Sequence, residues 1–352
     1  MTLRDLAHHT GFSTSTVSIA LRGSKKLPVA TRVKIQQAAK DLGYRINPML
    51  AALSSHRWHQ RSAPSGSTLA LLVEGKLEGQ KGIIERASTY GYQVEVFQVG
   101  DYPDPRRLSE ILFNRGILGV GVGQIFTPGF CSAFDWSHFV AVAISEGHER
   151  PPINLVMPNH FQAMQVGWDH ARALGYRRIG LALFETPTAL DYHDRCAAFM
   201  ERQQQVPPAD RIPILAFKPR SCPATESPEA AEKAQRLENI TYMGNWLQHH
   251  QPDVVLGFNS AILWLMRDAG WRIPKNAGFI SLWIDDDPIG ITVTGLVLTS
   301  TEVGCRAIDW LDSLLRSGER GIPRHPATMS IDMIWQDGIT APGIKPRRHP
   351  TK

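Results

Sequence analysis

From Thr68 onward, short apolar runs alternate with longer amphipathic stretches, and this alternation restricts the fold more than any other feature of the sequence. Short runs rich in β-branched residues are typical of strands buried on both faces of a parallel sheet. The runs expected to form strands are Thr68–Val73, Gln93–Val99, Ile117–Val122, Phe139–Ile144, Ile179–Phe184, Val254–Gly257 and Phe279–Trp283. The stretches expected to form helices are Gly82–Tyr90, Pro105–Arg115, Phe161–Leu174, Leu190–Gln204, Ala230–His249, Ile262–Ala269 and Glu302–Arg316. This order predicts doubly wound parallel sheets with helices on both faces.

The length of the chain, 352 residues, exceeds what one ordinary hydrophobic core accommodates. The alternating region covers 67–341, and about thirteen elements over that length favour two similar lobes. Residues 342–352 are rich in proline and basic side chains, a composition that predicts a disordered tail.

Three short helices are expected before residue 46. Gly11 suits a tight turn between the first two helices, because glycine tolerates a positive φ at low cost. Ser13 can cap the second helix, over 14–22, by accepting from its first free N–H groups. A third helix should begin near Pro28 and stop at Gly43. Helices in this arrangement form a helix-turn-helix, whose second helix enters the major groove of DNA.

The charge of the chain is divided unevenly. Residues 1–62 contain ten Lys and Arg against two acids, a net charge of +8, whereas 28 bases and 31 acids give the remainder −3. A basic head on a mildly acidic body is typical of proteins that bind the phosphate backbone, since Lys and Arg release condensed counterions there. A solvated basic surface is the alternative interpretation of the charge alone.

The cysteines are scattered and have no paired spacing: Cys131, Cys196, Cys222 and Cys305. They are expected to be reduced structural thiols, with no disulfide framework, no metal site and no cofactor. The N-terminus lacks an apolar leader, and no run reaches the ~18 apolar residues of a membrane helix. These features predict a cytoplasmic protein with no membrane partner.

Two stretches of the head carry a specific resemblance: TLRDLAHHTGFSTSTVSIALRG and LPVATRVKIQQAAKDLGYRINPMLAAL. They are similar to the head and hinge of the lactose-repressor/galactose-repressor (LacI/GalR) family of transcription regulators. The similarity includes T-hydrophobic-x-D-hydrophobic-A, G-hydrophobic-S-x-x-T-V-S, T-R-x-K-hydrophobic and L-G-Y-x-x-N. It implies a helix-turn-helix domain over 1–46 and a hinge helix with its linker over 47–66.

The resemblance also implies which residues touch DNA. Thr14, Ser15 and Ile19 would point at base edges, where small hydroxyls read several bases and a methyl group can pack on thymine. Thr16 and Ser18 would contact phosphates or cap the helix. Capping is the alternative role for Thr14 and Ser15, and packing on the core of the head is the alternative for Ile19. Arg22 and Lys26 are further expected phosphate contacts.

The hinge is too short and too polar to fold alone. In the family that it resembles, it becomes helical on DNA, where two copies pair. By position, Asn47 would contact the backbone and Leu53 would wedge into the minor groove, kinking the duplex. Packing of one hinge on the other is the alternative role of Leu53. Paired hinges and two heads imply a homodimer on a near-palindromic operator.

Weaker similarity continues through 67–341 and implies a periplasmic-binding-protein-like core of two doubly wound lobes. Lobe 1 is expected at about 67–158 and 296–323, and lobe 2 at about 159–290 and 324–341. Arg195 matches the arginine of the "RxxGF" segment, which implies a bidentate anchor for effector oxygens. The other expected ligand contacts are Asn159, His160, Gln162, Asn259, Trp283 and Asp285. A surface ion pair is the alternative for Arg195, and strand core is the alternative for Trp283.

Motifs of enzymes are missing from the sequence. The stretch from Gly119 to Gln124 lacks the third glycine of a dinucleotide fingerprint, and the stretch from Gly278 to Leu282 is not a GxSxG elbow. We therefore expect no catalytic residues. The family resemblance implies a repressor whose operator affinity is controlled by a carbohydrate effector between the lobes. An activator, or a regulator that needs a non-sugar corepressor, fits the same residues.

Overall fold

The computed structural model describes residues 3–21, 27–42, 67–144, 152–185, 190–219, 227–285 and 292–344. The chain divides into two compact units, Met1–Pro64 and Ser65–Lys352. The first unit contains three helices in its described part: α1 (Leu3–Thr10), α2 (Thr14–Leu21) and α3 (Val29–Asp41). This is the arrangement that the sequence predicted for the head.

A small apolar core holds these helices together. Its buried side chains come from all three helices: Leu6, Ala7, Val17, Ala20, Ile35 and Ala39. Gly11 has a φ of +72° in the turn between α1 and α2, as its expected role requires. Ser13 caps α2, because its Oγ accepts a hydrogen bond from the backbone N–H of Thr16 at 3.2 Å.

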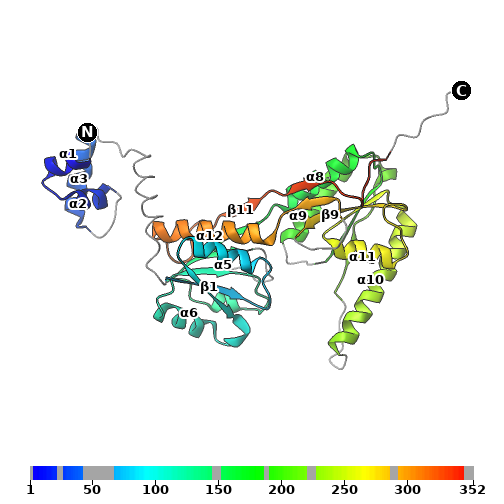
Figure 1. Ribbon diagram of the computed structural model, residues 1–352, viewed down its shortest axis with the longest axis horizontal. Coiled ribbons are helices and arrows are strands. Elements are labelled where there is room, and N and C mark those ends of the chain that lie inside the picture. Colours follow the sequence, from blue (N-terminus) through cyan, green and yellow to red (C-terminus); the bar gives the residue numbers. More distant parts are fainter. Residues whose placement is uncertain are drawn as a thin grey trace. The chain divides into compact units, whose positions relative to one another are not determined.

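The second unit contains two six-stranded sheets (Figure 1). In the first sheet the order is β11-β5-β4-β3-β1-β2, and every neighbouring pair is parallel. Its strands are β1 (Thr68–Val73), β2 (Gln93–Gln98), β3 (Gly119–Val122), β4 (Val140–Ile144), β5 (Asn154–Pro158) and β11 (Thr328–Ile331). Its helices are α5 (Gln80–Thr89), α6 (Pro105–Asn114), α7 (Phe130–Ala133) and α12 (Ser300–Ser317). A 3-10 turn, Val99–Asp101, follows β2.

In the second sheet the order is β12-β10-β9-β8-β6-β7, and only β12 runs antiparallel to its neighbour. Its strands are β6 (Ile179–Phe184), β7 (Leu215–Phe217), β8 (Val254–Gly257), β9 (Gly278–Ile284), β10 (Gly295–Val297) and β12 (Ile334–Gln336). Its helices are α8 (His160–Ala173), α9 (Leu190–Gln204), α10 (Pro228–His250) and α11 (Ser260–Asp268). A 3-10 turn, Pro208–Asp210, precedes β7.

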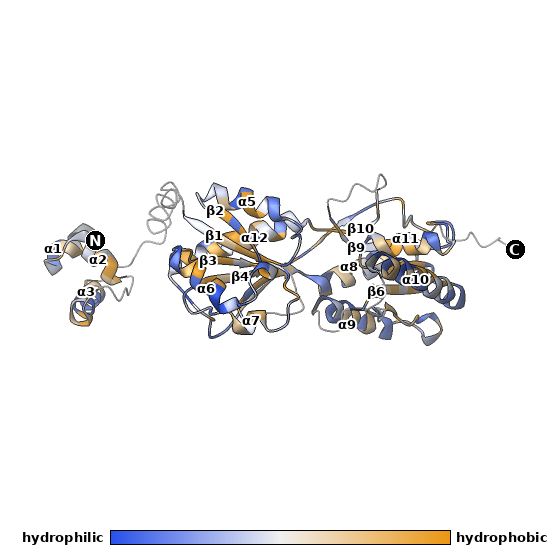
Figure 2. Cartoon of the chain, turned by 90° about the horizontal axis from the view of Figure 1, so that it is seen from below, coloured by the Kyte–Doolittle hydropathy of each residue, from blue (hydrophilic) through white to orange (hydrophobic). Residues whose placement is uncertain are grey.

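Both sheets are covered by helices on their two faces, as the sequence predicted. In the first sheet, Leu69 and Leu71 pack with α5 and α12, whereas Ala70 and Leu72 pack in a separate cluster with α6 and α7. In the second sheet, α8 and α9 cover one face and α10 and α11 the other. Figure 2 shows the apolar strands inside these layers and polar residues on the outer sides of the helices.

Three crossovers join the lobes, after β5, after β10 and after β11. Each crossover leaves the carboxyl end of a strand, so the carboxyl edges of both sheets lie at the junction of the lobes. This junction is where α/β folds of this type bind ligands.

Parts of the C-terminal region differ from expectation. β10 lies in the second sheet and β11 in the first, so the chain changes lobes later than the expected residues 296 and 324. The sequence did not indicate either strand, because β10 has three residues and β11 is an exposed edge strand. Pro342 and Ile344 were expected in a disordered tail. Instead, the Pro342 carbonyl accepts from the Tyr176 hydroxyl at 2.7 Å, and the Ile344 N–H donates to the Leu174 carbonyl at 2.8 Å.

Candidate functional site

Helix α2 carries the residues expected at base edges. Val17 and Ala20 point into the core of the head, which leaves Thr14 exposed at the start of the helix. Ile19 is half-buried and lies outside the buried cluster of the head. Thr16 contributes to the cap, because its Oγ1 lies 2.8 Å from the Oγ of Ser13.

Other residues of the expected DNA surface have no described side chain. Ser15 and Ser18 lie on α2, but only their backbone is described. Arg22, Lys26, Asn47 and Leu53 lie outside the described residues. Their expected contacts with DNA stay predictions.

At the carboxyl edge of the second sheet, Arg195 of α9 is the most buried charged residue, with 2% of its surface exposed. Its Nη1 donates to Asp191 Oδ2 at 2.6 Å, and its Nη2 lies 2.6 Å from His160 Nδ1. The guanidinium lies over the ring of Phe258, 4.2 Å from its centroid. The Arg195 side chain is 3% exposed and contacts α8 and the residue that follows β8, so it does not form the surface ion pair that was the alternative expectation.

The geometry of this contact assigns the proton of His160. A guanidinium has only donors, so the His160 Nδ1 must accept, and the neutral ring then carries its proton on Nε2. Burial lowers the pKa of His160 well below its ordinary value, and the positive charge of Arg195 lowers it further. His160 is therefore a neutral side chain at physiological pH.

Trp283, near the end of β9, joins an aromatic group around this pair. Its ring centroid lies 5.4 Å from that of Phe258 and 6.2 Å from that of His160. Its indole Nε1 donates to the Leu298 carbonyl at 2.8 Å, in the crossover that follows β10. Since Trp283 is only half-buried, it contributes to the surface of the junction as well as to the sheet.

Asn159 and Gln162, two more expected ligand residues, bind the third crossover. Asn159 Nδ2 donates to Asp332 Oδ1 at 2.7 Å, and its Oδ1 accepts from the Gln162 N–H and caps α8. The Gln162 side-chain amide bonds both the N–H of Met333 at 3.3 Å and its carbonyl at 3.4 Å. These contacts fix one crossover against the start of α8.

Asn259 and Asp285 have similar capping roles. Asn259 Oδ1 accepts from the Ala261 N–H at 3.0 Å at the start of α11. The Asp285 carboxylate accepts from the backbone N–H of Ser300 at 3.1 Å and from its hydroxyl at 2.5 Å. Asp285 follows β9 of the second sheet and Ser300 begins α12 on the first, so this contact spans the two lobes.

Sequence reasoning missed several carboxylates at the same edge. Glu185 follows β6, and its Oε2 is buried with no hydrogen-bond partner among the described residues. Asp194 is half-buried on α9, where burial raises its pKa and the negative charge of Asp191 raises it further. Tyr192 of the same helix has its pKa raised to about 12, mainly by burial, then by Cys196, and least by Glu185. The sequence did contain one signal for Glu185, because this residue directly follows a predicted strand and therefore lies at the carboxyl edge of the sheet.

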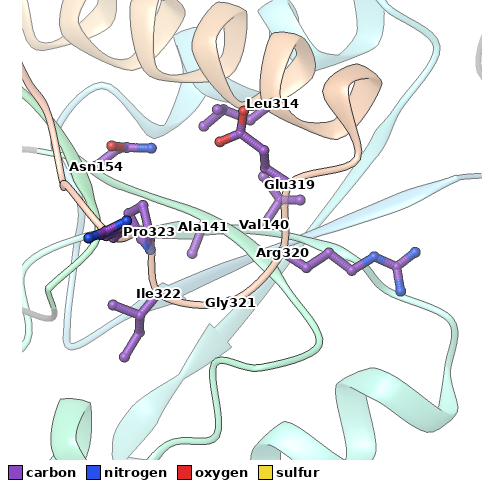
Figure 3. A pocket seen from close by; sticks show the side chains of 10 residues that line it. Val140, Ala141, Asn154, Leu314, Glu319, Arg320, Gly321, Ile322 and Pro323 are labelled. Carbon is purple, nitrogen blue, oxygen red and sulfur yellow. The ribbon is translucent and has the colours of Figure 1, made fainter. Parts of the chain in front are cut away.

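A cavity of about 250 Å³ lies elsewhere, at the amino edge of the first sheet (Figure 3). It is lined by Val140 and Asn154 at the starts of β4 and β5, by Leu314 near the end of α12, and by residues 319–324. Because this edge is opposite the crossovers, the cavity is separate from the candidate site. Among the described residues, no helix could cross a membrane and no cluster of His, Cys, Asp or Glu could hold a metal ion.

Comparison with known proteins gives a family match for the head. Residues 2–47 match the model of the bacterial regulatory proteins of the lacI family. The transcriptional regulator GntR of Pseudomonas aeruginosa is 26% identical over 185 residues, which cover 51% of this chain and 52% of that protein. The maltose regulon regulatory protein MalI of Escherichia coli is 26% identical over 194 residues, again 51% of this chain and 52% of the relative. The similarity thus spans about half the length of these curated relatives.

Solved structures resemble the fold over most of the chain. A lac repressor dimer bound to operator and an anti-inducer has a TM-score of 0.57 at 17% identity, covering 97% of this chain and 99% of that one. A complex of the regulator CelR with cellobiose has a TM-score of 0.56 at 15% identity, with coverage of 97% and 99%. A LacI family regulator of Enterococcus faecium with bound ribose has a TM-score of 0.56 at 13% identity, covering 79% and 100%. At these identities the likeness shows the fold: a helix-turn-helix head and a periplasmic-binding-protein-like core.

Proposed function

The chain resembles the LacI/GalR family of bacterial transcription regulators, and on that premise we propose that it is a sequence-specific DNA-binding repressor controlled by a small-molecule effector. The observation that carries the proposal is the match of residues 2–47 to the family together with the exposed start of α2. We propose a regulator rather than an enzyme because the relatives are all described as regulators.

The proposed operator contacts follow the recognition helix. Thr14, Ser15 and Ile19 contact base edges. Thr16 and Ser18 contact phosphates or cap α2. The remaining contacts with DNA come from Arg22, Lys26, Asn47 and Leu53. One head reads one half-site, so the active form is a homodimer on a near-palindromic operator. The basic charge of residues 1–62 supports this role, because it supplies the sequence-independent part of the affinity.

The proposed effector site lies at the junction of the lobes, around Arg195, His160 and Trp283. Neighbouring strands and helices bring these three side chains together at the carboxyl edge of the second sheet. Asn159, Gln162, Asn259 and Asp285 shape this edge through the crossovers and helix caps that they fix. The relatives bound to cellobiose and ribose support a polyhydroxylated effector. Effector binding would change the relative position of the two lobes at the crossovers, and through it the spacing of the paired hinges.

The test uses a duplex selected from a random-sequence pool by the full-length protein. Deleting residues 1–62 should abolish binding to this duplex and leave the fold of the rest unchanged by circular dichroism, because the two units have separate cores. Retained affinity in the truncated protein would contradict the proposal.

A matched pair of substitutions in the head tests the role of α2 separately from that of α3. Thr14→Ala should weaken binding about thirty-fold, because each of the two heads loses a contact to a base edge worth about 1 kcal/mol. Gln37→Ala, on the exposed surface of α3, should leave the affinity unchanged. Equal effects of the two substitutions would contradict the proposal that α2 contacts the bases.

A further inference from the structure

The cavity at the amino edge of the first sheet has no part in the proposed function (Figure 3). Two backbone contacts hold the loop after α12 against the strands. The Gly321 N–H donates to the Phe139 carbonyl at 2.8 Å, and the Ala327 carbonyl accepts from the Leu155 N–H at 3.0 Å. The lining residues 321–324 lie between these two anchors. The outer wall of the cavity is therefore fixed in the free protein, as is usual for ligand sites.

Asn154, the first residue of β5, offers a hydrogen-bond donor to this cavity. The residue is 8% exposed, and its Oδ1 accepts from the Ala327 N–H at 2.9 Å. This contact fixes the amide group, so that the opposite atom, Nδ2, is directed toward the cavity (Figure 3). No hydrogen bond joins Nδ2 to another described residue. A largely buried amide donor without an acceptor is destabilising, and an acceptor within the cavity would satisfy it.

Charged side chains of opposite sign line the same cavity without forming a pair. Glu319 and Arg324 both belong to the lining, and no ion pair joins either of them to another described residue. Arg320 also belongs to the lining, but Figure 3 shows its guanidinium directed away from Asn154. A ligand that complements this lining carries a negative and a positive group at once.

The rest of the lining is mainly apolar. It consists of Val140, Ala141, Leu314, Ile322, Pro323 and Gly321. The side chains of this group offer no hydrogen bonds, so they suit an apolar part of the ligand. The volume of about 250 Å³ lies just below the range of about 300–1,000 Å³ that is usual for drug-sized ligands, so the occupant is a small molecule.

We propose that this cavity binds a free α-amino acid with a small apolar side chain. The carboxylate of the amino acid accepts from Asn154 Nδ2 and pairs with Arg324, and its ammonium group pairs with Glu319. Its side chain contacts the apolar part of the lining. The site is separate from the proposed effector site at the junction of the lobes, and the inference does not depend on the proposed function.

The first test compares three probes of one shape by calorimetric titration into the full-length protein. They are L-leucine, 4-methylpentanoate, which lacks the ammonium group, and 3-methylbutylamine, which lacks the carboxylate. L-Leucine should bind to one site per chain, and each analogue should bind about five-fold more weakly, because it loses one pair with an exposed charged side chain. No saturable binding of L-leucine, or equal binding of either analogue, would overturn the proposal.

The second test places the bound amino acid in the cavity. Glu319→Gln should weaken L-leucine binding about five-fold and leave the affinity for 4-methylpentanoate unchanged. Arg324→Gln should weaken L-leucine binding to a similar extent and leave the affinity for 3-methylbutylamine unchanged. Both side chains are exposed, so neither change should disturb the fold. Glu85→Gln, an exposed change on α5, is the control and should alter none of the three affinities. An unchanged affinity for L-leucine in Glu319→Gln or in Arg324→Gln would show that the assignment of this cavity is wrong.

Discussion

Replacing Arg195 with alanine tests whether the buried group at the junction holds the second lobe together. The side chains of Arg195 and Asp191 are 3% and 20% exposed, so their ion pair is largely withdrawn from water. Removing one partner of a buried pair costs about 3–5 kcal/mol, since the other charge stays buried without compensation. Asp191 retains some contact with water, which places the expected loss near the lower limit, at about 3 kcal/mol.

Further contacts of Arg195 add to this loss. His160 Nδ1 loses the donor that lies 2.6 Å away, and Phe258 loses the guanidinium on its face. At roughly 2–4 °C for each kcal/mol in a domain of this size, Arg195→Ala should lower the melting temperature by about 6–12 °C. Scanning calorimetry of the full-length protein at pH 7.5 measures this change.

Arg202→Ala provides a control on the same helix. Arg202 donates to Asp169 at 2.9 Å, but the Asp169 side chain is 59% exposed, so this pair should contribute under about 1 kcal/mol. Arg195→Lys should recover only part of the loss, because one ammonium cannot reproduce the planar fork that reaches Asp191 and His160. If Arg195→Ala melts within about 2 °C of Arg202→Ala, the reasoning about burial and pairing at this site is wrong.

The other predictions concern His160 and Gly79. The folded-state pKa of His160 lies below its ordinary value of 6.5, so the unfolded state binds more protons below that pH and stability should fall on acidification, by up to about 1.4 kcal/mol per pH unit. His160→Gln keeps an acceptor for Arg195 and should reduce this dependence between pH 7.5 and 5.5 in thermal melts; an unchanged dependence would assign it to other groups. A Cβ on Gly79, whose φ is +76°, would lie 2.3 Å from the Ser300 carbonyl oxygen, so Gly79→Ala should cost about 2–4 kcal/mol by urea unfolding. Gly129, with a φ of +81° and open space around it, is the control and should cost only about 1–2 kcal/mol, and equal losses would show that α5 and α12 can move apart.

Local patterns in the sequence were enough to predict most elements. Runs such as Thr68–Val73 form buried strands because parallel strands covered on both faces need continuous apolar side chains. Gly11 and Ser13 defined the turn and cap of the head, since both effects act within a few residues. β5, β7, β10, β11 and β12 were not predicted: β7, β10 and β12 have three residues each, β11 is an exposed edge strand, and β5 includes the polar Asn154 and ends in Pro158.

The character of the proposed effector site was decided by tertiary structure. The sequence identified Arg195 and His160 as separate candidates, but only the packing of α9 against α8 places them 2.6 Å apart and makes the histidine a neutral acceptor. Asn159, Gln162 and Asp285 were predicted to face a ligand, whereas their partners come from crossovers more than a dozen residues away. Charge balance depends on which groups meet in space and how far water is excluded. For this reason the sequence by itself determined the fold class, and the tertiary structure determined which partners its polar side chains have.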